Sequence, residues 1–288
     1  MSDRKEDDPP NGDDSSQRTE PLEGEAMVEA RELGSLGDFR LLRCIGRGGM
    51  ATVYEAFQAS MRRHVALKVL APGHMFSEKD VTRFEREAWI GGRLSHPNIV
   101  TVFGQGRVGE THYLAMELVH GGSLQDSLKK SREGARRDEG ATSLRSAHVR
   151  EMCRLFAGVA DGLDTVHRQK IIHRDIKPGN LLFTADGSRL LLSDFGLARG
   201  EDATLLTRRG DFLGTVRYMS PEQLLASRVH IGHPTDIYSL GVSLYEAVTL
   251  TYPFAGDSEE AYLASVTTKE PIPPRRRNPA VPRDLETI

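Results

Sequence analysis

The chain has 288 residues, of which 38% are hydrophobic and 27% are charged. A chain of this length can bury a core of its own, which excludes a small fold held together by disulfides. The two cysteines, Cys44 and Cys153, form neither a Cys-x-x-Cys pair nor a cluster with histidines, so a reducing, cytoplasmic setting fits best. No apolar run approaches the roughly 18 residues of a membrane-spanning helix, so membrane anchoring is expected only through sequence beyond residue 288.

The net charge of −3 is distributed unevenly along the chain. Residues 1–34 carry 11 acidic and 4 basic side chains and are rich in Asp, Glu, Ser, Pro and Gly. Such a segment cannot bury enough apolar surface to offset the cost of ordering, so a disordered acidic tail is expected over residues 1–36. The small basic surplus of the remaining chain is too weak to indicate binding to nucleic acid.

The next part of the chain predicts strands around one helix. The short apolar runs FRLLRCI, ATVYEAF and HVALKVL are separated by glycines or a polar turn, which indicates an antiparallel meander. After Ser77, a plausible helix cap, Val81, Phe84 and Ala88 share one helical face. The segments IVTVFGQG and THYLAMELV then return to a strand pattern. The expected order is three strands, a helix and two strands.

The second half of the chain is predicted to be mainly helical. An amphipathic helix is expected from Ala147, and residues 131–141 are interpreted as a solvated insertion before it. A second helix is expected over residues 236–250, ended by Tyr252 and Pro253. Apolar residues at spacings of three and four define the buried stripes, namely Val149, Met152, Phe156, Val159, Leu163 and Val166 in the first helix and Ile237, Leu240, Leu244, Ala247 and Val248 in the second. A small β-rich lobe is thus followed by a larger helical lobe.

A glycine-rich stretch, IGRGGMATVY at 45–54, is shared in outline by three nucleotide-binding architectures. A dinucleotide-binding fingerprint would open a helix and be followed by an acidic residue about 20 positions later, whereas here a strand follows and Lys68 stands near that position. The Walker sequence Gly-Lys-Ser/Thr does not occur in the chain. What remains is a hairpin whose glycines let backbone amides approach phosphates, with a plain β-turn as the equal alternative.

Two further motifs, IIHRDIKPGNLLF at 171–183 and LLSDFGLARG at 191–200, decide between these alternatives. With them the chain resembles the eukaryotic-type serine/threonine protein kinase family, in particular its bacterial members, from Gly37 to the end. The resemblance implies a bilobal α+β kinase fold with an N-lobe at about 37–116, a hinge at 117–122 and a C-lobe at 123–288 without its last helices. It also implies an enzyme that transfers the γ-phosphate of ATP to Ser or Thr hydroxyls of proteins.

The resemblance assigns catalytic roles by position. Lys68 in VALK matches the lysine that neutralises the α- and β-phosphates, and Glu87 matches its ion-pair partner. Asp175 matches the base that accepts the proton of the substrate hydroxyl, and Lys177 matches the lysine that contacts the γ-phosphate and accompanies Ser/Thr acceptors. Asn180 and Asp194 would bind Mg²⁺, with Mn²⁺ as the alternative metal.

The resemblance also implies a nucleotide site between the lobes. The glycines would cover the phosphates, apolar side chains would enclose the adenine ring, and the backbone of the hinge would hydrogen-bond the adenine. Met116 would line the back of the pocket. The residues expected at this site, in addition to Lys68, are Ile45, Gly46, Gly48, Gly49, Val53, Ala66, Met116, Glu117, Val119 and Leu182.

Regulation is expected in the activation segment between Asp194 and Ser-Pro-Glu at 220–222. Thr207 stands where bacterial relatives are often autophosphorylated, and a phosphate there could pair with Arg174. Thr215 matches a position that contacts the catalytic aspartate and lysine. Autophosphorylation within a homodimer is a further expectation.

Four features qualify the resemblance. Ala51 replaces the third glycine of the loop, and Gly91 stands where a bulky apolar residue is usual. Gly179 replaces an acidic residue typical of arginine-directed kinases. The arginine that usually pairs with Glu222 is not found in the 288 residues. The competing interpretation is a pseudokinase or scaffold without phosphotransfer, which the joint presence of all six catalytic and metal-binding side chains argues against.

Overall fold

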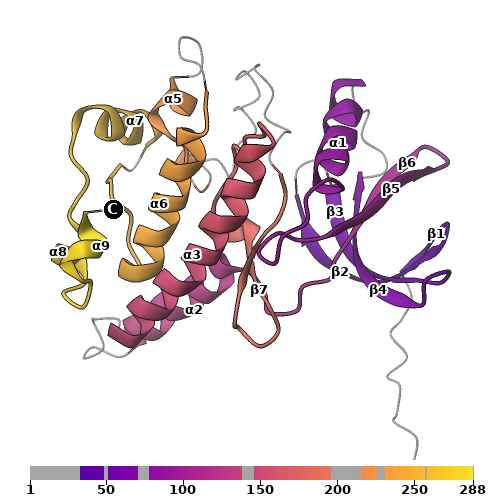
Figure 1. Ribbon diagram of the computed structural model, residues 1–288, viewed down its shortest axis with the longest axis horizontal. Helices are drawn as coiled ribbons and strands as arrows, with labels where there is room; N and C mark the ends of the chain where they lie inside the picture. The colour runs from indigo at the N-terminus through magenta and orange to yellow at the C-terminus, as the bar shows by residue number, and fades with distance from the viewer. Residues whose placement is uncertain are drawn as a thin grey trace, which may run out of the picture. The chain divides into compact units, whose positions relative to one another are not determined.

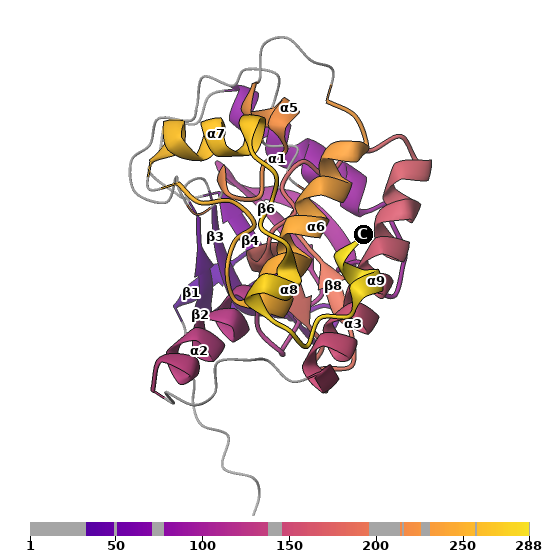
Figure 2. The same ribbon diagram turned by 90° about the vertical axis from the view of Figure 1, so that its left-hand side faces the viewer.

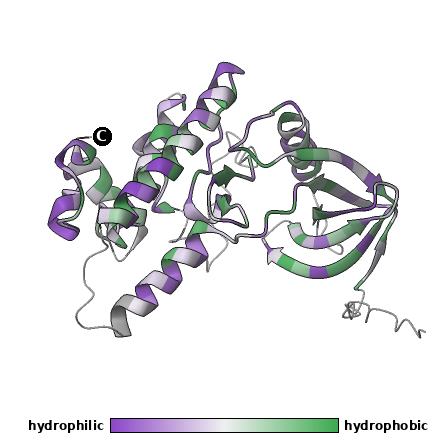
Figure 3. Cartoon of the chain, turned by 60° about the horizontal axis from the view of Figure 1, so that its bottom comes forward, coloured by the Kyte–Doolittle hydropathy of each residue, from purple (hydrophilic) through white to green (hydrophobic). Residues whose placement is uncertain are grey.

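The computed structural model describes residues 33–48, 51–70, 78–137, 146–195, 214, 216–225, 231–256 and 258–287. An antiparallel sheet in the order β1-β2-β3-β4-β6-β5 forms the first part of this region (Figure 1). Apolar and polar residues alternate along its strands (Figure 3), as expected when the two faces of a sheet meet different surroundings. The strands are β1 Gly34–Leu36, β2 Phe39–Arg47, β3 Ala51–Gln58, β4 Arg63–Leu70, β5 Val102–Val108 and β6 Thr111–Met116.

The predicted meander is confirmed, because β2, β3 and β4 pair antiparallel as neighbours. One strand was not expected: Gly34–Leu36, within the range 1–36 predicted to be a disordered tail, pairs with β2. Gly37 follows with φ +56°, a conformation open to glycine, so a tight turn connects the two strands. The pairing satisfies backbone groups of a segment whose composition alone predicts disorder. The rest of the expected tail lies outside the described residues.

Helix α1, Glu78–Gly91, packs against one face of the sheet (Figure 1). Its predicted face, Val81, Phe84 and Ala88, joins one apolar cluster with strand residues Leu70 and Leu114. Gly91 permits this close approach, since a Cβ atom at position 91 would collide with Val102 Cγ2 on β5. The expected cap, Ser77, lies outside the described residues.

The second part of the structure is mainly helical (Figures 1 and 2). Its main core is built on α3, whose predicted stripe is buried together with Leu155 and Gly162. Its elements are α2 Leu124–Arg137, α3 Ser146–Arg168, the 3₁₀ turn η1 Pro178–Asn180, the β7 Leu181–Phe183 and β8 Leu190–Leu192 hairpin, α5 Pro221–Leu224, α6 Pro234–Thr249, α7 Glu259–Thr268, α8 Pro274–Arg277 and α9 Arg283–Glu286.

Three details of the helical prediction are wrong. Residues 131–137 belong to α2 and are not an insertion. Helix α6 ends at Thr249, before Tyr252 and Pro253, because Leu250 adopts a left-handed φ of 58° and its N–H closes the helix on the Glu246 carbonyl. Ile237 is 56% exposed, although its spacing placed it in the apolar stripe of α6.

The buried surface of α6 is instead partly polar. Its buried polar residues are Thr235, Asp236, Ser239, Ser243, Glu246 and Thr249. Each makes a hydrogen bond to a neighbouring backbone or side-chain group, which offsets the cost of burying it. An apolar periodicity therefore could not identify the face of α6 that the protein buries.

Candidate active site

Lys68 joins two carboxylates that come from distant parts of the chain. It lies on β4, and its ammonium Nζ donates to Glu87 Oε1 of α1 at 2.6 Å and to Asp194 Oδ1, just after β8, at 2.7 Å. Lys68 and Leu70 alternate with Val65, Leu67 and Val69 along β4, so Lys68 points to the face that α1 covers. The strand and the helix together thus place one cation between two acids.

The three charged groups shift one another's pKa values. Burial lowers the pKa of Lys68, but the two carboxylates outweigh this effect and the net pKa is raised. Burial raises the pKa of Asp194, yet Lys68 more than compensates, and the net pKa of Asp194 is lowered. Burial dominates at Glu87, whose pKa is raised. At Glu87 the attraction of Lys68 does not fully offset burial.

Asp175, Lys177 and Asn180 come together in the loop that leads into β7. Lys177 Nζ donates to Asp175 Oδ2 at 2.9 Å. Asn180 Nδ2 donates to the same carboxylate oxygen at 3.0 Å and to the Asp175 carbonyl at 2.7 Å. Two donors therefore orient a carboxylate whose side chain keeps 18% of its surface exposed. A carboxylate held in this way can accept a proton from a hydroxyl group that approaches from solvent.

Asp236, at the start of α6, holds the loop that carries Asp175 through hydrogen bonds. It is fully buried and accepts backbone N–H bonds from His173 and Arg174, each at 2.8 Å. The His167 ring contacts the same carboxylate at 2.8 Å. These bonds fix Arg174 in a left-handed backbone conformation, φ 66°, immediately before Asp175. The sequence prediction treated Asp236 only as the start of a helix, so this supporting role was missed.

His173 connects the loop to the segment after β8. Its Nε2 faces the Ser193 carbonyl at 3.1 Å, and its Nδ1 accepts the Asp175 N–H at 3.3 Å. These partners require a proton on Nε2 alone. Burial lowers the pKa of the ring, which agrees with this neutral form. The ring also packs against Phe195, with centroids 5.0 Å apart.

An apolar cluster lies where the adenine ring is expected. Ala66 and Met116 are buried, and Val53, Val119 and Leu182 pack against the same cluster. The Glu117 N–H donates to the Thr101 carbonyl at 2.8 Å, so this N–H is not free to bind an adenine ring. The structure brings these residues together from β3, β4, β6 and β7.

The glycine-rich hairpin is described only in part. Gly46 is paired with Val53 across β2 and β3, and the Gly48 N–H donates to the Ala51 carbonyl at 2.8 Å. Ile45 remains 39% exposed. Gly49, at the tip, lies outside the described residues.

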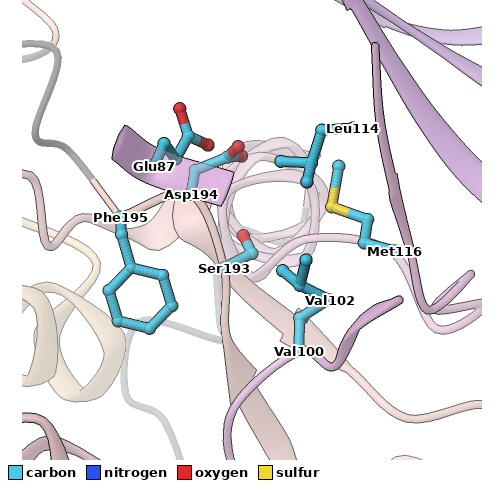
Figure 4. A pocket seen from close by; sticks show the side chains of 8 residues that line it. All are labelled: Glu87, Val100, Val102, Leu114, Met116, Ser193, Asp194 and Phe195. Carbon is cyan, nitrogen blue, oxygen red and sulfur yellow. The ribbon is translucent and has the colours of Figure 1, made fainter. Parts of the chain in front are cut away.

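A small cavity lies beside the carboxylates that Lys68 joins. Its lining comes from α1, β6, the start of β5 and the segment after β8 (Figure 4). The Glu87 and Asp194 carboxylates lie at one end and aliphatic side chains at the other. The lining residues are Glu87, Val100, Val102, Leu114, Met116, Ser193, Asp194 and Phe195.

The residues expected to hold a metal suit a hard cation. Asn180 uses its amide nitrogen for Asp175, and its amide oxygen accepts no hydrogen bond from the described residues. Together with the Asp194 carboxylate it offers oxygen ligands, which Mg²⁺ and Mn²⁺ prefer. No cluster of three or more His, Cys, Asp or Glu side chains suited to a metal occurs among the described residues.

Two expected regulatory residues, Thr207 and Thr215, lie outside the described residues. Arg174 is described, and its Nε atom is buried without a hydrogen-bond partner in the described part of the chain. The Arg174 carbonyl accepts a bond from Gln223 Nε2 of α5 at 2.8 Å. The segment around α5 is therefore tied directly to the catalytic loop.

This fold and this arrangement of side chains are those of the protein kinase class. Comparison with known proteins supports the same assignment. The family model described as protein kinase domain matches residues 39–283, and the chain belongs to this family. Kinases of this family use ATP and a divalent metal ion and act on proteins. None of the helices described here combines the length and hydropathy needed to cross a bilayer.

The chain is similar to curated kinases of several bacteria. The chain is 39% identical to the serine/threonine-protein kinase PknA of Mycobacterium tuberculosis over 244 residues, covering 83% of this chain and 52% of that protein. It is 36% identical to a probable serine/threonine-protein kinase of Clostridium perfringens over 250 residues (87% and 34%), and 33% identical to PrkC of Bacillus subtilis over 255 residues (88% and 36%). The predicted resemblance to bacterial serine/threonine kinases is confirmed. The chain spans about a third to a half of the length of these relatives.

Proposed function

We propose that the chain is the catalytic domain of a protein kinase that transfers the γ-phosphate of ATP to Ser or Thr hydroxyls of proteins. The observation that supports this most directly is the joint placement of two groups. Lys68 meets Glu87 and Asp194 in one of them, and Lys177 and Asn180 hold Asp175 in the other. A pseudokinase or scaffold would not need both groups.

In this mechanism the protein acts mainly by positioning and electrostatics. Lys68 would contact the α- and β-phosphates, and the apolar cluster around Ala66 and Met116 would hold the adenine ring. Asp175 would accept the hydroxyl proton of the acceptor, while Lys177 would stabilise charge on the γ-phosphate. Asn180 and Asp194 would hold Mg²⁺, with Mn²⁺ as the alternative, and this metal would neutralise phosphate charge.

The test is phosphotransfer from radiolabelled ATP to a generic basic protein in the presence of Mg²⁺. Replacing Asp175→Asn removes the proton acceptor and preserves the side-chain shape, so the rate is expected to fall by about 10²–10⁴-fold. Equal rates for the two proteins would refute the proposal. Nucleotide binding without transfer in the parent protein would instead favour the pseudokinase interpretation.

We further propose that phosphorylated Thr207 orders the activation segment by pairing with Arg174, whose buried Nε lacks a partner among the described residues. Phosphorylation between the subunits of a homodimer is the route expected from the sequence. Mass spectrometry of active protein, together with the activity of Thr207→Ala, tests this proposal. An unmodified Thr207 and a fully active variant would contradict it.

A cytoplasmic location is also part of the proposal. Cys44 and Cys153 are both free thiols, as is usual in a reducing compartment. Fractionation of cells that express the complete reading frame would test it, and recovery of the protein outside the cytoplasm would refute it.

A further inference from the structure

Both carboxylate oxygens of Glu246, a buried residue on α6, have partners within the protein. It is 2% exposed. Arg132 of α2 donates from Nη2 to Oε1, and the Tyr218 hydroxyl donates to Oε2 at 2.5 Å. Arg132 is itself fixed by a bond from Nε to the Leu250 carbonyl at 2.9 Å. The acid therefore has no oxygen left without a partner and is not available to a cation from outside.

Two guanidinium groups gather around one aromatic ring beside this carboxylate. The Arg217 Cζ atom lies 4.2 Å from the centroid of the Tyr252 ring, and the Arg132 Cζ atom lies 5.4 Å from it. Arg217 is half-buried and has no carboxylate within ion-pair distance among the residues that the structure describes. A guanidinium stacked on a ring keeps its in-plane N–H donors for a further ligand.

The backbone of the segment that carries Arg217 is held by α6 and α7. The Tyr262 hydroxyl donates to the Arg217 carbonyl at 2.7 Å, and the Ser239 hydroxyl donates to the carbonyl of Tyr218 at 2.7 Å. A few residues further on, Gln223 bonds to the Arg174 carbonyl next to Asp175. Residues 216–225, which include Arg217, thus contact α6, α7 and, through Gln223, the loop that carries Asp175.

Gly179 in the catalytic loop does not provide an acidic side chain. A Cβ atom at Gly179 would lie 2.7 Å from Gln125 Oε1, so the neutral side chain of α2 occupies the space beside this backbone. Position 179 carries no charge and Glu246 is already neutralised by Arg132. Among the residues that the structure describes, the charge of Arg217 beside Tyr252 is left without a carboxylate partner.

We propose that Arg217, with Arg132 beside it, selects acceptor segments that carry an aspartate or glutamate near the phosphorylated residue. This inference rests on the proposed kinase function and names its substrate class. The half-buried guanidinium would donate to the carboxylate of the acceptor, and hydrogen bonds to a charged group are among the stronger ones in proteins.

The test uses peptides with a single Thr and otherwise neutral residues. Asp, Gln or Lys is placed in turn at each position from four before to four after the Thr, and kcat/KM is measured with the full chain. We expect Asp to exceed Gln by about tenfold at one or more positions. In Arg217→Gln the ratio of kcat/KM for the Asp and Gln peptides should fall toward one. The Arg217→Glu variant should have its highest kcat/KM with the Lys peptide. Arg168→Gln, which changes an exposed arginine at the end of α3 that pairs with Asp164, is the control and should keep the preference for Asp.

Peptide binding separates this inference from the proposed function. The same peptides with Ala in place of Thr are titrated against Asp175→Asn by fluorescence anisotropy, which requires no phosphotransfer. Tighter binding of the Asp peptide, lost in Asp175→Asn/Arg217→Gln, would support the arginine site even if no peptide were phosphorylated. Equal rates and equal affinities for Asp, Gln and Lys peptides would overturn the inference and leave the kinase function standing. Preference for Lys in the parent protein would overturn it as well.

Discussion

Two buried glutamates each meet a cation, one at the sheet and one in the helical part of the protein. Glu87 is 8% exposed and bonds to Lys68, whereas Glu246 is 2% exposed and bonds to Arg132. Lys68 also holds Asp194, so its compact ammonium is shared between groups at the expected nucleotide site. Arg132 uses a planar fork to tie Glu246 to the Leu250 carbonyl.

The Lys68–Glu87 and Arg132–Glu246 pairs differ in whether the cation can exchange its carboxylate partner for another anion. A lysine ammonium between two carboxylates can turn toward a phosphate because it is a point charge on a flexible stem. The guanidinium on α2 is fixed by two directed bonds and a neighbouring ring. We infer that the first pair serves chemistry and the second pair serves stability.

Removing the cation of the second pair should give the largest loss of stability. Arg132→Ala leaves Glu246 buried without its cation, and the free energy of unfolding is expected to fall by about 3–5 kcal/mol in urea denaturation. Arg132→Met/Glu246→Gln removes both charges and should recover most of this loss. Arg154→Ala, which breaks an exposed pair with Glu151, is the control and should cost at most about 1 kcal/mol. If Arg132→Ala and Arg154→Ala lowered the free energy of unfolding by similar amounts, the burial of Glu246 would not make the loss of its cation more costly.

Removing the cation of the first pair should act mainly on activity. Lys68→Met removes the charge that would contact the phosphates, and kcat/KM for phosphotransfer is expected to fall by about 10²–10³-fold. Lys130→Met, at an exposed position on α2, should leave the rate within about twofold of the parent protein. A Lys68→Met variant with full activity would mean that the pair is structural only.

The close contact of α1 and β5, which positions Glu87, is expected to have an intermediate effect. Gly91→Ala places a methyl group against Val102, and such overpacking typically costs about 1–3 kcal/mol. Gly91→Ala/Val102→Ala should regain part of this stability. Gly134→Ala on α2, where a Cβ meets open space, should instead stabilise by about 0.5–1 kcal/mol. If both single variants stabilise the protein equally, α1 does not depend on the contact with Val102.

The smallest effect concerns His173, which links the catalytic loop to the segment of Asp194. Burial lowers the pKa of His173 below its ordinary value of 6.5, so the folded protein binds fewer protons here than the unfolded chain. This contribution to stability is complete above pH 6.5 and is lost as the pH falls through the folded pKa. Urea denaturation between pH 7.5 and 5.5 should show a shallower pH dependence for His173→Gln than for the parent protein. Equal slopes would show that the ring is not held neutral.

Local sequence patterns were sufficient for the fold class and for most of the elements. Alternating residues predicted β2 to β4, and spacings of three and four predicted α1 and α3, because the burial of one face imposes these periods. The motifs around Lys68, Asp175 and Asp194 indicated the family because several short sequences occur in a fixed order. The prediction was wrong for Ile237 and for residues 131–137, where burial depends on neighbours from elsewhere in the chain.

The contacts between distant segments were decided only by the tertiary structure. The Lys68–Asp194 bond joins residues 126 positions apart, and the Arg132–Glu246 pair spans 114 positions. Motifs marked Lys68 and Asp194 separately, although the bond between them was not predicted, whereas no motif marked Arg132, Arg217 or Asp236. Their positions follow from the packing of α2 and α6 around a buried polar network. The sequence by itself therefore determined the family and its reaction chemistry, while the charge around Tyr252, and with it the proposed choice of acceptor, was determined by which helices meet.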